Sequence, residues 1–525
     1  AKYLITDTSF PPYFIKKKDQ VYLNTWHGTP LKAMGRIVPR REYALGNIQR
    51  NFLISDYLLY QNDFSKDVFL EDYMIKNIYP GKVLLSGYPR NSIFFNNQRR
   101  DLVRKECGIT DKQVIVYMPT WRGLFHHKET NKQLKQLARY FAQIDEMLND
   151  SQVFYVKLHP YVKDKVDYSG YSHIREFPKE YESYDFLNAS DALVTDYSSI
   201  MFDDAVTKNK IILFAYDREE YLTGRGLYLK LEDMGLPIVD NVEGLIAELG
   251  TETKEYKEFY ERFCNYDSAD TPARVIDILL KQQETSSIKT NQDRRETVLL
   301  FIKGFKKDVE SPNRLEMINA IDTDKYDVYV CMKTDEVKNN TEILSELRKE
   351  IGYFPIIYDI NYTRADYFIS KIMGRFFYKG GSFGKVADKL MKREKRKYFG
   401  DVSFDYVIHQ SCQDKMIGNM CLQLGEELVY NFSYFNPGML KQGGGFSRSI
   451  KYFMKLLPKY DWVVVGKGSK GLKLQGENII FSQDSISQAN EILQYISSKN
   501  IDGGNKDASY NRPYKRDNDE ERRGS

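Results

Sequence analysis

The chain has 525 residues, a formal net charge of +4 and 42% hydrophobic residues. This balance excludes an intrinsically disordered chain and a strongly basic nucleic-acid-binding one. At roughly 150 residues per domain, about three to four compact units are expected. The five cysteines lack the close spacing of a zinc site or a disulfide framework, which favours a reducing cytoplasm.

The sequence contains no run of the roughly 20 apolar residues that a membrane-spanning helix needs. It starts at Ala1 without an initiator methionine and enters at once a strand-like segment, Tyr3–Ile5. We therefore expect the first lobe to lack upstream segments.

In the first half, short β-branched and aromatic segments alternate with amphipathic ones, a pattern that predicts parallel strands covered by helices. The expected strands are Val21–Leu23, Val83–Leu85, Val114–Met118, Val153–Leu158, Ala192–Thr195 and Ile211–Phe214. The expected helices are Asn131–Asp150 and Lys254–Cys264. The fold class is therefore predicted to be α/β, with two Rossmann-type lobes, residues 1–110 and 111–285, and a cleft between them.

A polar linker, residues 286–296, precedes a second alternation of strands and helices. Its expected strands are Val298–Ile302, Val328–Met332, Pro355–Tyr358, Tyr406–His409 and Trp462–Val465. Its expected helices are Asn313–Ile321, Thr341–Ile351 and Lys385–Lys397. A further α/β domain is predicted over residues 297–500, followed by a disordered tail over 501–525, where apolar residues are few.

Two histidines come directly after predicted strands. His27 stands within Trp26–Pro30, and His159 stands within Lys157–Pro160. Open α/β sheets keep their ligands at the carboxyl ends of their strands, and an imidazole there can exchange a proton near neutral pH. Either histidine alone would also fit a structural role in which backbone groups satisfy it.

The segment Asp196–Ser199 follows the predicted strand Ala192–Thr195 and precedes a helix-like run from Ile200. Two hydroxyls and several backbone N–H groups would then face the place where a phosphate binds. The same residues would also serve as an ordinary helix cap. Together with the two histidines, this segment indicates phosphoryl chemistry.

Thr120 and Arg122 follow the predicted strand Val114–Met118 and would bring a guanidinium to the same sheet edge. Arginine can bind phosphate oxygens through two parallel hydrogen bonds, although a structural salt bridge is an equal alternative. Asp203 and Asp204 are adjacent, but neighbouring carboxylates on a helix point in different directions. No metal site and no cofactor are therefore expected.

Five segments occur in the order of the motifs of one family. They are Asn24–Lys32, Gly87–Asn91, Met118–Arg122, Lys157–Pro160 and Ser190–Ser199. Over roughly residues 1–283 the chain resembles the CDP-glycerol glycerophosphotransferases, which polymerise teichoic acids and capsule polymers. Arg225–Tyr228 and Asp270–Val275 also fit.

The resemblance implies a GT-B-like pair of lobes, with the acceptor on the side of residues 1–110 and CDP-glycerol bound by residues 111–285. It implies that His27 and His159 are the catalytic residues, with His27 the general base on the incoming hydroxyl. The diphosphate would be held by His159, Arg122 and the start of the helix at Ser198 and Ser199. The substrate-binding residues carried over are Thr29, Thr120, Arg122, Asp196, Ser198, Ser199 and Arg225.

The same resemblance implies CDP-glycerol as donor and an anionic polyol-phosphate or lipid-linked glycan as acceptor, with CMP released. It places the protein in the cytoplasm, peripheral at the inner face of the cell membrane, with no nucleic-acid partner. From about Thr297 the chain resembles, diffusely, the glycosyltransferase-like modules fused to such polymerases. A catalytic role and a polymer-binding role both stay open for that region.

Three alternatives remain open from the sequence. The same motifs would serve a ribitolphosphotransferase that uses CDP-ribitol. A nucleotide-sugar glycosyltransferase or epimerase of GT-B architecture would also bind a diphosphate at Asp196–Ser199. A polymer-binding scaffold without activity is the third.

Overall fold

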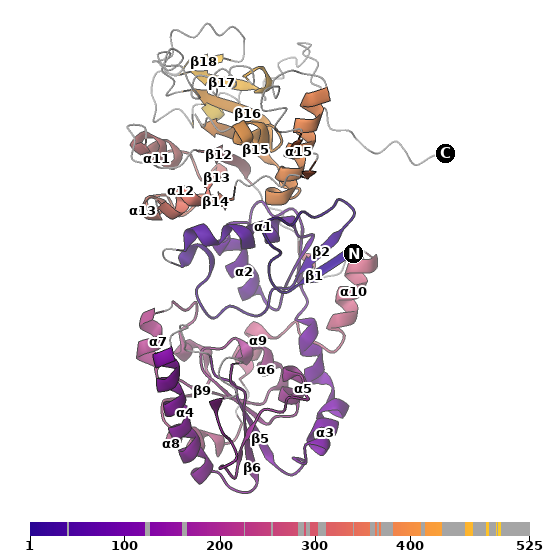
Figure 1. Cartoon of the computed structure of the whole chain (residues 1–525), viewed down its shortest axis with the longest axis vertical. Coiled ribbons are helices and arrows are strands. Elements are labelled where there is room, and N and C mark those ends of the chain that lie inside the picture. The colour runs from indigo at the N-terminus through magenta and orange to yellow at the C-terminus, as the bar shows by residue number, and fades with distance from the viewer. Residues whose placement is uncertain are drawn as a thin grey trace, which may run out of the picture.

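The computed structural model describes residues 1–38, 41–120, 127–159, 165–224, 226–253, 256–281, 288–289, 295–302, 311–339, 341–357, 363–364, 367–368, 382–410, 415–432, 457–465, 479–481, 490 and 492–494. Three largely parallel sheets with helices follow one another along the chain, which confirms the predicted α/β class. The first lobe lies in the middle of the molecule, between the second lobe at the bottom and the third domain at the top (Figure 1).

The first lobe is built on a five-stranded sheet in the order β1-β2-β3-β4-β11. Its strands are β1 Tyr3–Thr6, β2 Val21–Asn24, β3 Tyr57–Tyr60, β4 Lys82–Leu85 and β11 Ile288–Lys289, of which only β11 pairs antiparallel. Its helices are α1 Gly46–Ile54, α2 Asp63–Asp72 and α10 Thr271–Lys281. Asn62 caps α2 because its side chain accepts the N–H of Ser65.

The second lobe is built on a six-stranded parallel sheet in the order β7-β6-β5-β8-β9-β10. Its strands are β5 Gln113–Tyr117, β6 Gln152–Val156, β7 Ile174–Glu176, β8 Ala192–Thr195, β9 Lys210–Phe214 and β10 Ile238–Val239. Its helices are α3 Asn97–Glu106, α4 His127–Met147, α5 Ser183–Asn188, α6 Ile200–Asp204, α7 Arg218–Gly224, α8 Val242–Leu249 and α9 Lys257–Phe263. The order reverses between β5 and β8, which makes the carboxyl ends of these strands the expected ligand position.

The third domain has a seven-stranded parallel sheet in the order β14-β13-β12-β15-β16-β17-β18. Its strands are β12 Glu296–Phe301, β13 Tyr326–Lys333, β14 Gly352–Ile356, β15 Phe404–Gln410, β16 Gly425–Phe432, β17 Trp462–Val465 and β18 Ile479–Phe481. Its helices include α11 Ser311–Asn319, α12 Thr334–Asn339, α13 Thr341–Leu344, α15 Ser382–Phe399 and α16 Lys415–Cys421.

The third domain is docked on the first lobe through α1. The Arg50 guanidinium donates to the carbonyl of Lys397 at 3.0 Å, and the Gln49 amide donates to the carbonyl of Tyr353 at 3.2 Å. One hydrophobic cluster continues from the first lobe into the third sheet. The two units therefore share a core in addition to these hydrogen bonds.

The chain crosses twice between the first and second lobes. The first crossing is a 3₁₀ helix, Pro89–Phe95, and the second is the segment between α9 and α10. Asp267 in the second crossing accepts the N–H of Tyr88 at 2.9 Å and the side-chain amide of Asn91 at 3.1 Å. The two crossings are therefore tied to each other by one carboxylate.

The packing differs from the predicted domain limits at both crossings. Helix α3, expected in the first lobe, packs on the second lobe, where Val103 lies in its core. Helix α10, expected in the second lobe, returns to the first sheet and packs Val275 and Ile278 there. Within the expected linker, Ile288–Lys289 forms strand β11. The expected tail, residues 501–525, lies outside the described residues.

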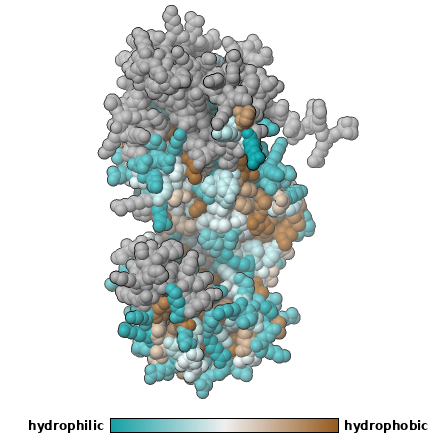
Figure 2. Space-filling model, viewed as in Figure 1, coloured by the Kyte–Doolittle hydropathy of each residue, from teal (hydrophilic) through white to brown (hydrophobic). Residues whose placement is uncertain are grey.

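Apolar side chains are exposed on the side of the first lobe where β1 and α10 lie (Figure 2). They include Ile5, Ile276 and Leu280, which are 62%, 52% and 55% exposed. Among the helices that the structure describes, none combines the length and apolar character required to cross a bilayer.

Candidate active site

The first part of the site lies at the strand-order reversal of the second sheet. Asp196 directly follows β8, and its buried carboxylate accepts the N–H of Thr120 at 2.8 Å and 3.0 Å. The Thr195 hydroxyl donates to the carbonyl of Met118 at 2.7 Å. These bonds join the loops after β5 and β8, so Asp196 holds the loop that leads to Arg122.

The second part is the loop after β2, which carries His27 on a strained backbone. Trp26 has φ +52° and Gly28 has φ +154°, both outside the usual range of L-residues. A bulky residue with positive φ is rare and typical of functional sites. The buried Trp26 ring stacks on the His27 ring with centroids 4.4 Å apart.

The hydrogen bond of His27 defines its tautomer. Its Nδ1 lies 3.1 Å from the carbonyl oxygen of Asp7, and a carbonyl can only accept, so Nδ1 carries the hydrogen. In the neutral ring Nε2 is then the unprotonated nitrogen. Because the side chain is exposed, Nε2 is able to accept a proton from a substrate.

The His27 loop of the first lobe meets helix α6 of the second lobe. A Cβ atom added to Gly28 would lie 3.2 Å from Ser199 Oγ, which precedes α6. Residues 31–33 of the same chain segment pair with Gly226–Tyr228 through backbone hydrogen bonds. The two lobes therefore come together beside Ser199.

Arg90 joins the two lobes at this contact. Its Nη2 donates to the carbonyl of His27 at 3.1 Å and to the Asp203 carboxylate at 2.9 Å. Tyr184 also donates to Asp203 at 2.9 Å, and the guanidinium lies over the Tyr88 ring at 4.5 Å. Although burial opposes the charge, Asp203 raises the pKa of Arg90 above its ordinary value.

Two further carboxyl groups near this contact are buried. Burial, with the neighbouring Asp203 charge second, raises the pKa of Asp204 to about 8. Burial raises the pKa of Asp267 to about 7, against the lowering effect of its hydrogen bond from Gln61. Both pKa values show that a negative charge is costly in this region unless it is paired as in Asp203.

The sequence model of the family described as CDP-Glycerol:Poly(glycerophosphate) glycerophosphotransferase matches residues 1–281. The chain belongs to this family. The expected resemblance is thereby confirmed for the first two lobes. The match ends before the third domain, so the expected glycosyltransferase-like character of residues 297–500 stays a prediction.

Two curated relatives and one solved structure show how far the similarity extends. A teichoic acid poly(glycerol phosphate) polymerase of Staphylococcus epidermidis is 31% identical over 54% of this chain and 42% of its own length. A teichoic acid glycerol-phosphate transferase of Staphylococcus aureus is 30% identical over 54% of this chain and 76% of its own. The structure of the wall teichoic acid polymerase TagF is 28% identical over 54% of this chain and 73% of that chain, with a TM-score of 0.45.

Several of the family residues predicted from the sequence lie at the contact between the lobes. Ser199 meets the His27 loop, and Ser198 Oγ accepts the N–H of Ile200 at 3.5 Å. His159 is exposed in the loop after β6, which neighbours β5 in the sheet. No described contact joins His159 to His27, so their convergence on one substrate stays a prediction.

Other predicted residues of the glycerophosphotransferase site have a different setting. The Thr29 hydroxyl is buried and bonded to Gln61, Asn62 and Ser65, which indicates a role in the packing of the loop, and its predicted contact with substrate stays a prediction. Arg122 and Arg225 lie outside the described residues.

Arg90 has no predicted role, and Asp203 is considered from the sequence only as a metal ligand. The resemblance of Gly87–Asn91 to a family motif is the signal that points to Arg90. Within the described residues, no group of three or more His, Cys, Asp or Glu side chains is placed to bind a metal ion.

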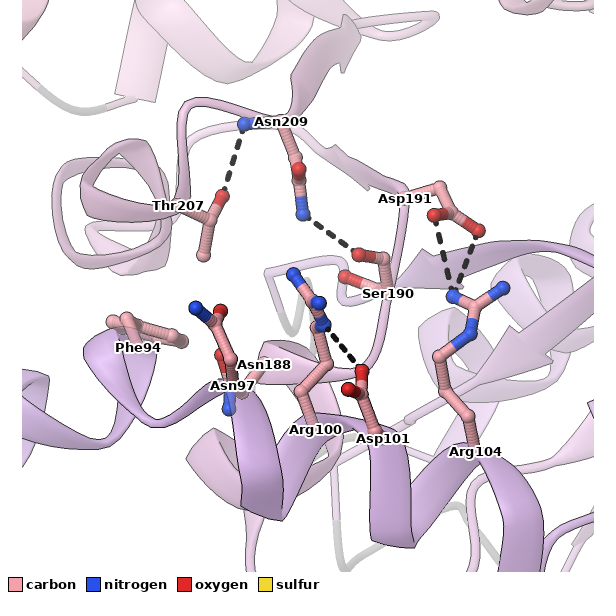
Figure 3. A pocket seen from close by; sticks show the side chains of 10 residues that line it. All are labelled: Phe94, Asn97, Arg100, Asp101, Arg104, Asn188, Ser190, Asp191, Thr207 and Asn209. Carbon is pink, nitrogen blue, oxygen red and sulfur yellow. Dashed lines mark hydrogen bonds and ion pairs between the residues drawn. The ribbon is translucent and has the colours of Figure 1, made fainter. Parts of the chain in front are cut away.

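A polar hollow of about 320 Å³ in the second lobe is distinct from this site (Figure 3). Helix α3 and the segments that lead into β8 and β9 surround it, and Arg100, Asn188 and Asn209 are among its lining residues. It therefore lies at the amino ends of the strands, opposite the edge that carries Asp196. Its charged side chains are largely paired with one another, as Arg104 is with Asp191 at 3.1 Å.

Proposed function

We propose that the chain transfers glycerol phosphate from CDP-glycerol to the hydroxyl end of a polyol-phosphate or glycan acceptor and releases CMP. Family membership supports the donor, and the names of the relatives support a place in teichoic acid synthesis. The carrying observation is that the His27 loop packs against Ser199. This contact supports a reaction in which His27 of one lobe acts as base beside the predicted phosphate-binding turn of the other.

In the proposed reaction, the acceptor hydroxyl oxygen attacks the phosphorus that bears glycerol. The bond from that phosphorus to the bridging oxygen breaks, and CMP leaves with the electron pair. His27 Nε2 takes the proton of the hydroxyl, while its Nδ1–H stays bonded to Asp7. Such positioning and charge compensation are what phosphoryl transfer requires.

We assign the diphosphate to the second lobe. His159, Arg122, Ser198 and Ser199 would compensate its charge, with Arg225 as a further contact. Thr120 and Asp196 would act by holding the loop that precedes Arg122, since they are bonded to each other. The acceptor would enter from the first lobe, next to His27.

The acceptor is proposed to be an anionic polyol-phosphate or a lipid-linked glycan. A lipid-linked acceptor would bring the protein to the inner face of the cell membrane as a peripheral protein. The family resemblance supports this placement, together with the cysteine pattern of a reducing compartment.

The test is CMP formation by the purified chain with CDP-glycerol and a short glycerol-phosphate primer. His27→Ala should lower the rate at least 100-fold, because general base catalysis typically contributes about 10²–10⁴-fold. The matched control is His173→Gln. His173 is bonded to Asp145 and lies just before β7, at the amino ends of the strands of the second sheet, whereas Asp196 lies at their carboxyl ends. A fully active His27→Ala variant would exclude the proposed base.

The donor is tested separately. CDP-ribitol and UDP-sugars are offered in place of CDP-glycerol under the same conditions. Faster CMP release from CDP-ribitol would turn the proposal into a ribitolphosphotransferase, and preference for a UDP-sugar would refute it. Primer binding without CMP release from any donor would indicate a scaffold.

A further inference from the structure

The third domain repeats the strand order of the second lobe. From β14 to β18 the order is third, second, first, fourth, fifth, sixth and seventh strand of that domain, and all described pairs are parallel. The order reverses between β12 and β15. Sheets of this order bind ligands at the carboxyl ends of the strands on either side of the reversal.

Gln410 is the last residue of β15 and therefore stands at that place. Its side chain is 1% exposed, and neither Oε1 nor Nε2 has a hydrogen-bond partner within the described part of the chain. A buried polar group without a partner is rare in native proteins and points to a missing ligand or water. The amide is thus an unexplained polar group at the expected ligand position.

The backbone around Gln410 is held on both sides. β15 pairs with β12 and with β16, where Gln410 is in register with Asn431. The preceding residue, His409, is fixed through its Nδ1, which lies 2.9 Å from the Tyr460 hydroxyl. The direction of the Gln410 side chain is therefore set by the sheet.

The second lobe shows what the same position does there. Thr195 ends β8 at the reversal of its sheet, and its hydroxyl donates to the carbonyl of Met118. By the strand pairing, Gln410 corresponds to Thr195, and it has no such bond within the described residues. The second lobe therefore uses this position to hold its own loop.

We propose that the third domain binds a nucleotide at this reversal, with its base edge on the Gln410 amide. A primary amide presents one acceptor beside two donors. A phosphate offers only acceptors and would leave Oε1 unsatisfied, whereas a base edge offers a donor and an acceptor side by side. This site is separate from the one at His27, because Gln410 ends a strand of the third sheet, whereas His27 follows β2 of the first sheet and lies where the first lobe meets the second (Figure 1).

The test is calorimetric titration of the full chain with ADP, CDP, GDP and UDP in turn. At least one of them is expected to bind the wild-type chain and to bind Gln410→Leu at least tenfold more weakly. Gln423→Leu is the matched control, because Gln423 follows α16 and precedes β16 at the opposite edge of the sheet. CMP formation should be unchanged in both variants. A failure of the proposed transferase would therefore appear in the CMP assay and not in the nucleotide titration.

Hydrogen–deuterium exchange of the wild-type chain gives a readout that does not depend on the variant folding. The nucleotide that binds should slow exchange in the peptides of β12 and β15. The proposal is overturned if none of the four nucleotides binds in a way that Gln410→Leu weakens. It is also overturned if bound nucleotide leaves exchange in β12 and β15 unaltered.

Discussion

Arg90→Ala tests whether the contact between the lobes sustains the site. Asp203 is only 3% exposed, so removing Arg90 leaves a buried carboxylate with Tyr184 as its remaining neutral donor. Breaking one side of a buried ion pair costs about 3–5 kcal/mol. Because the Arg90 side chain is 29% exposed, we expect the lower end, about 3 kcal/mol. The carbonyl of His27 loses its donor as well, and misplacement by about 1 Å can cost about 100-fold in rate.

The assay combines CMP release with urea unfolding of Arg90→Ala, Asp203→Ala and the double variant. We expect kcat to fall about 100-fold and the two substitutions to be coupled by about 1–3 kcal/mol. Arg100→Ala is the control, because Arg100 and Asp101 form an exposed pair worth at most about 1 kcal/mol. The reasoning would be refuted if the two substitutions changed the free energy of unfolding additively, within about 0.5 kcal/mol, and Arg90→Ala kept the wild-type kcat.

Three further predictions concern single residues. Gly28→Ala should lower kcat and destabilise the chain by about 1–3 kcal/mol, because alanine is strained at φ +154° and its Cβ would lie 3.2 Å from Ser199 Oγ. A variant with the wild-type rate and melting temperature would contradict this. The raised pKa of Asp204, about 8, means that the folded chain keeps a proton that the unfolded chain releases above about pH 4, so stability falls as pH rises from about 4 to 8. The free energy of unfolding of Asp204→Asn should therefore gain on that of the wild type by up to about 1.4 kcal/mol per pH unit between these values. Its melting temperature should exceed that of the wild type by more at pH 8 than at pH 5, and an equal difference at both pH values would exclude this account. His159→Ala should raise KM for CDP-glycerol more than His27→Ala does, which initial-rate measurements at varied donor concentration would show or disprove.

The strands and the sheet edges were predictable because their signal is local. Runs such as Ala192–Thr195 and Trp462–Val465 were located from composition alone, since strands buried on both faces are continuously apolar. The β3 strand Tyr57–Tyr60 is absent from the prediction, although it is buried throughout. The expected helix over Thr341–Ile351 is shorter, ending at Leu344.

The contacts that complete the site were not predictable, because they depend on distant parts of the chain. Asn91 and Asp267 are 176 positions apart, and Arg90 and Asp203 are 113 apart. No local pattern distinguishes an arginine that pairs across two lobes from one in solvent. The burial of Thr29 is of the same kind, since Gln61 and Ser65 cover its hydroxyl only in the folded lobe.

The double crossing between the lobes limits how the molecule can open to exchange substrates. Both crossing segments meet at Asp267, so sliding one lobe past the other would break the bonds from Tyr88 and Asn91. Opening the lobes would also break the backbone bonds that join residues 31–33 to Gly226–Tyr228. The third domain shares a core with the first lobe, so the two would move together as one unit. Any opening of the site would therefore move the second lobe relative to a unit made of the first lobe and the third domain.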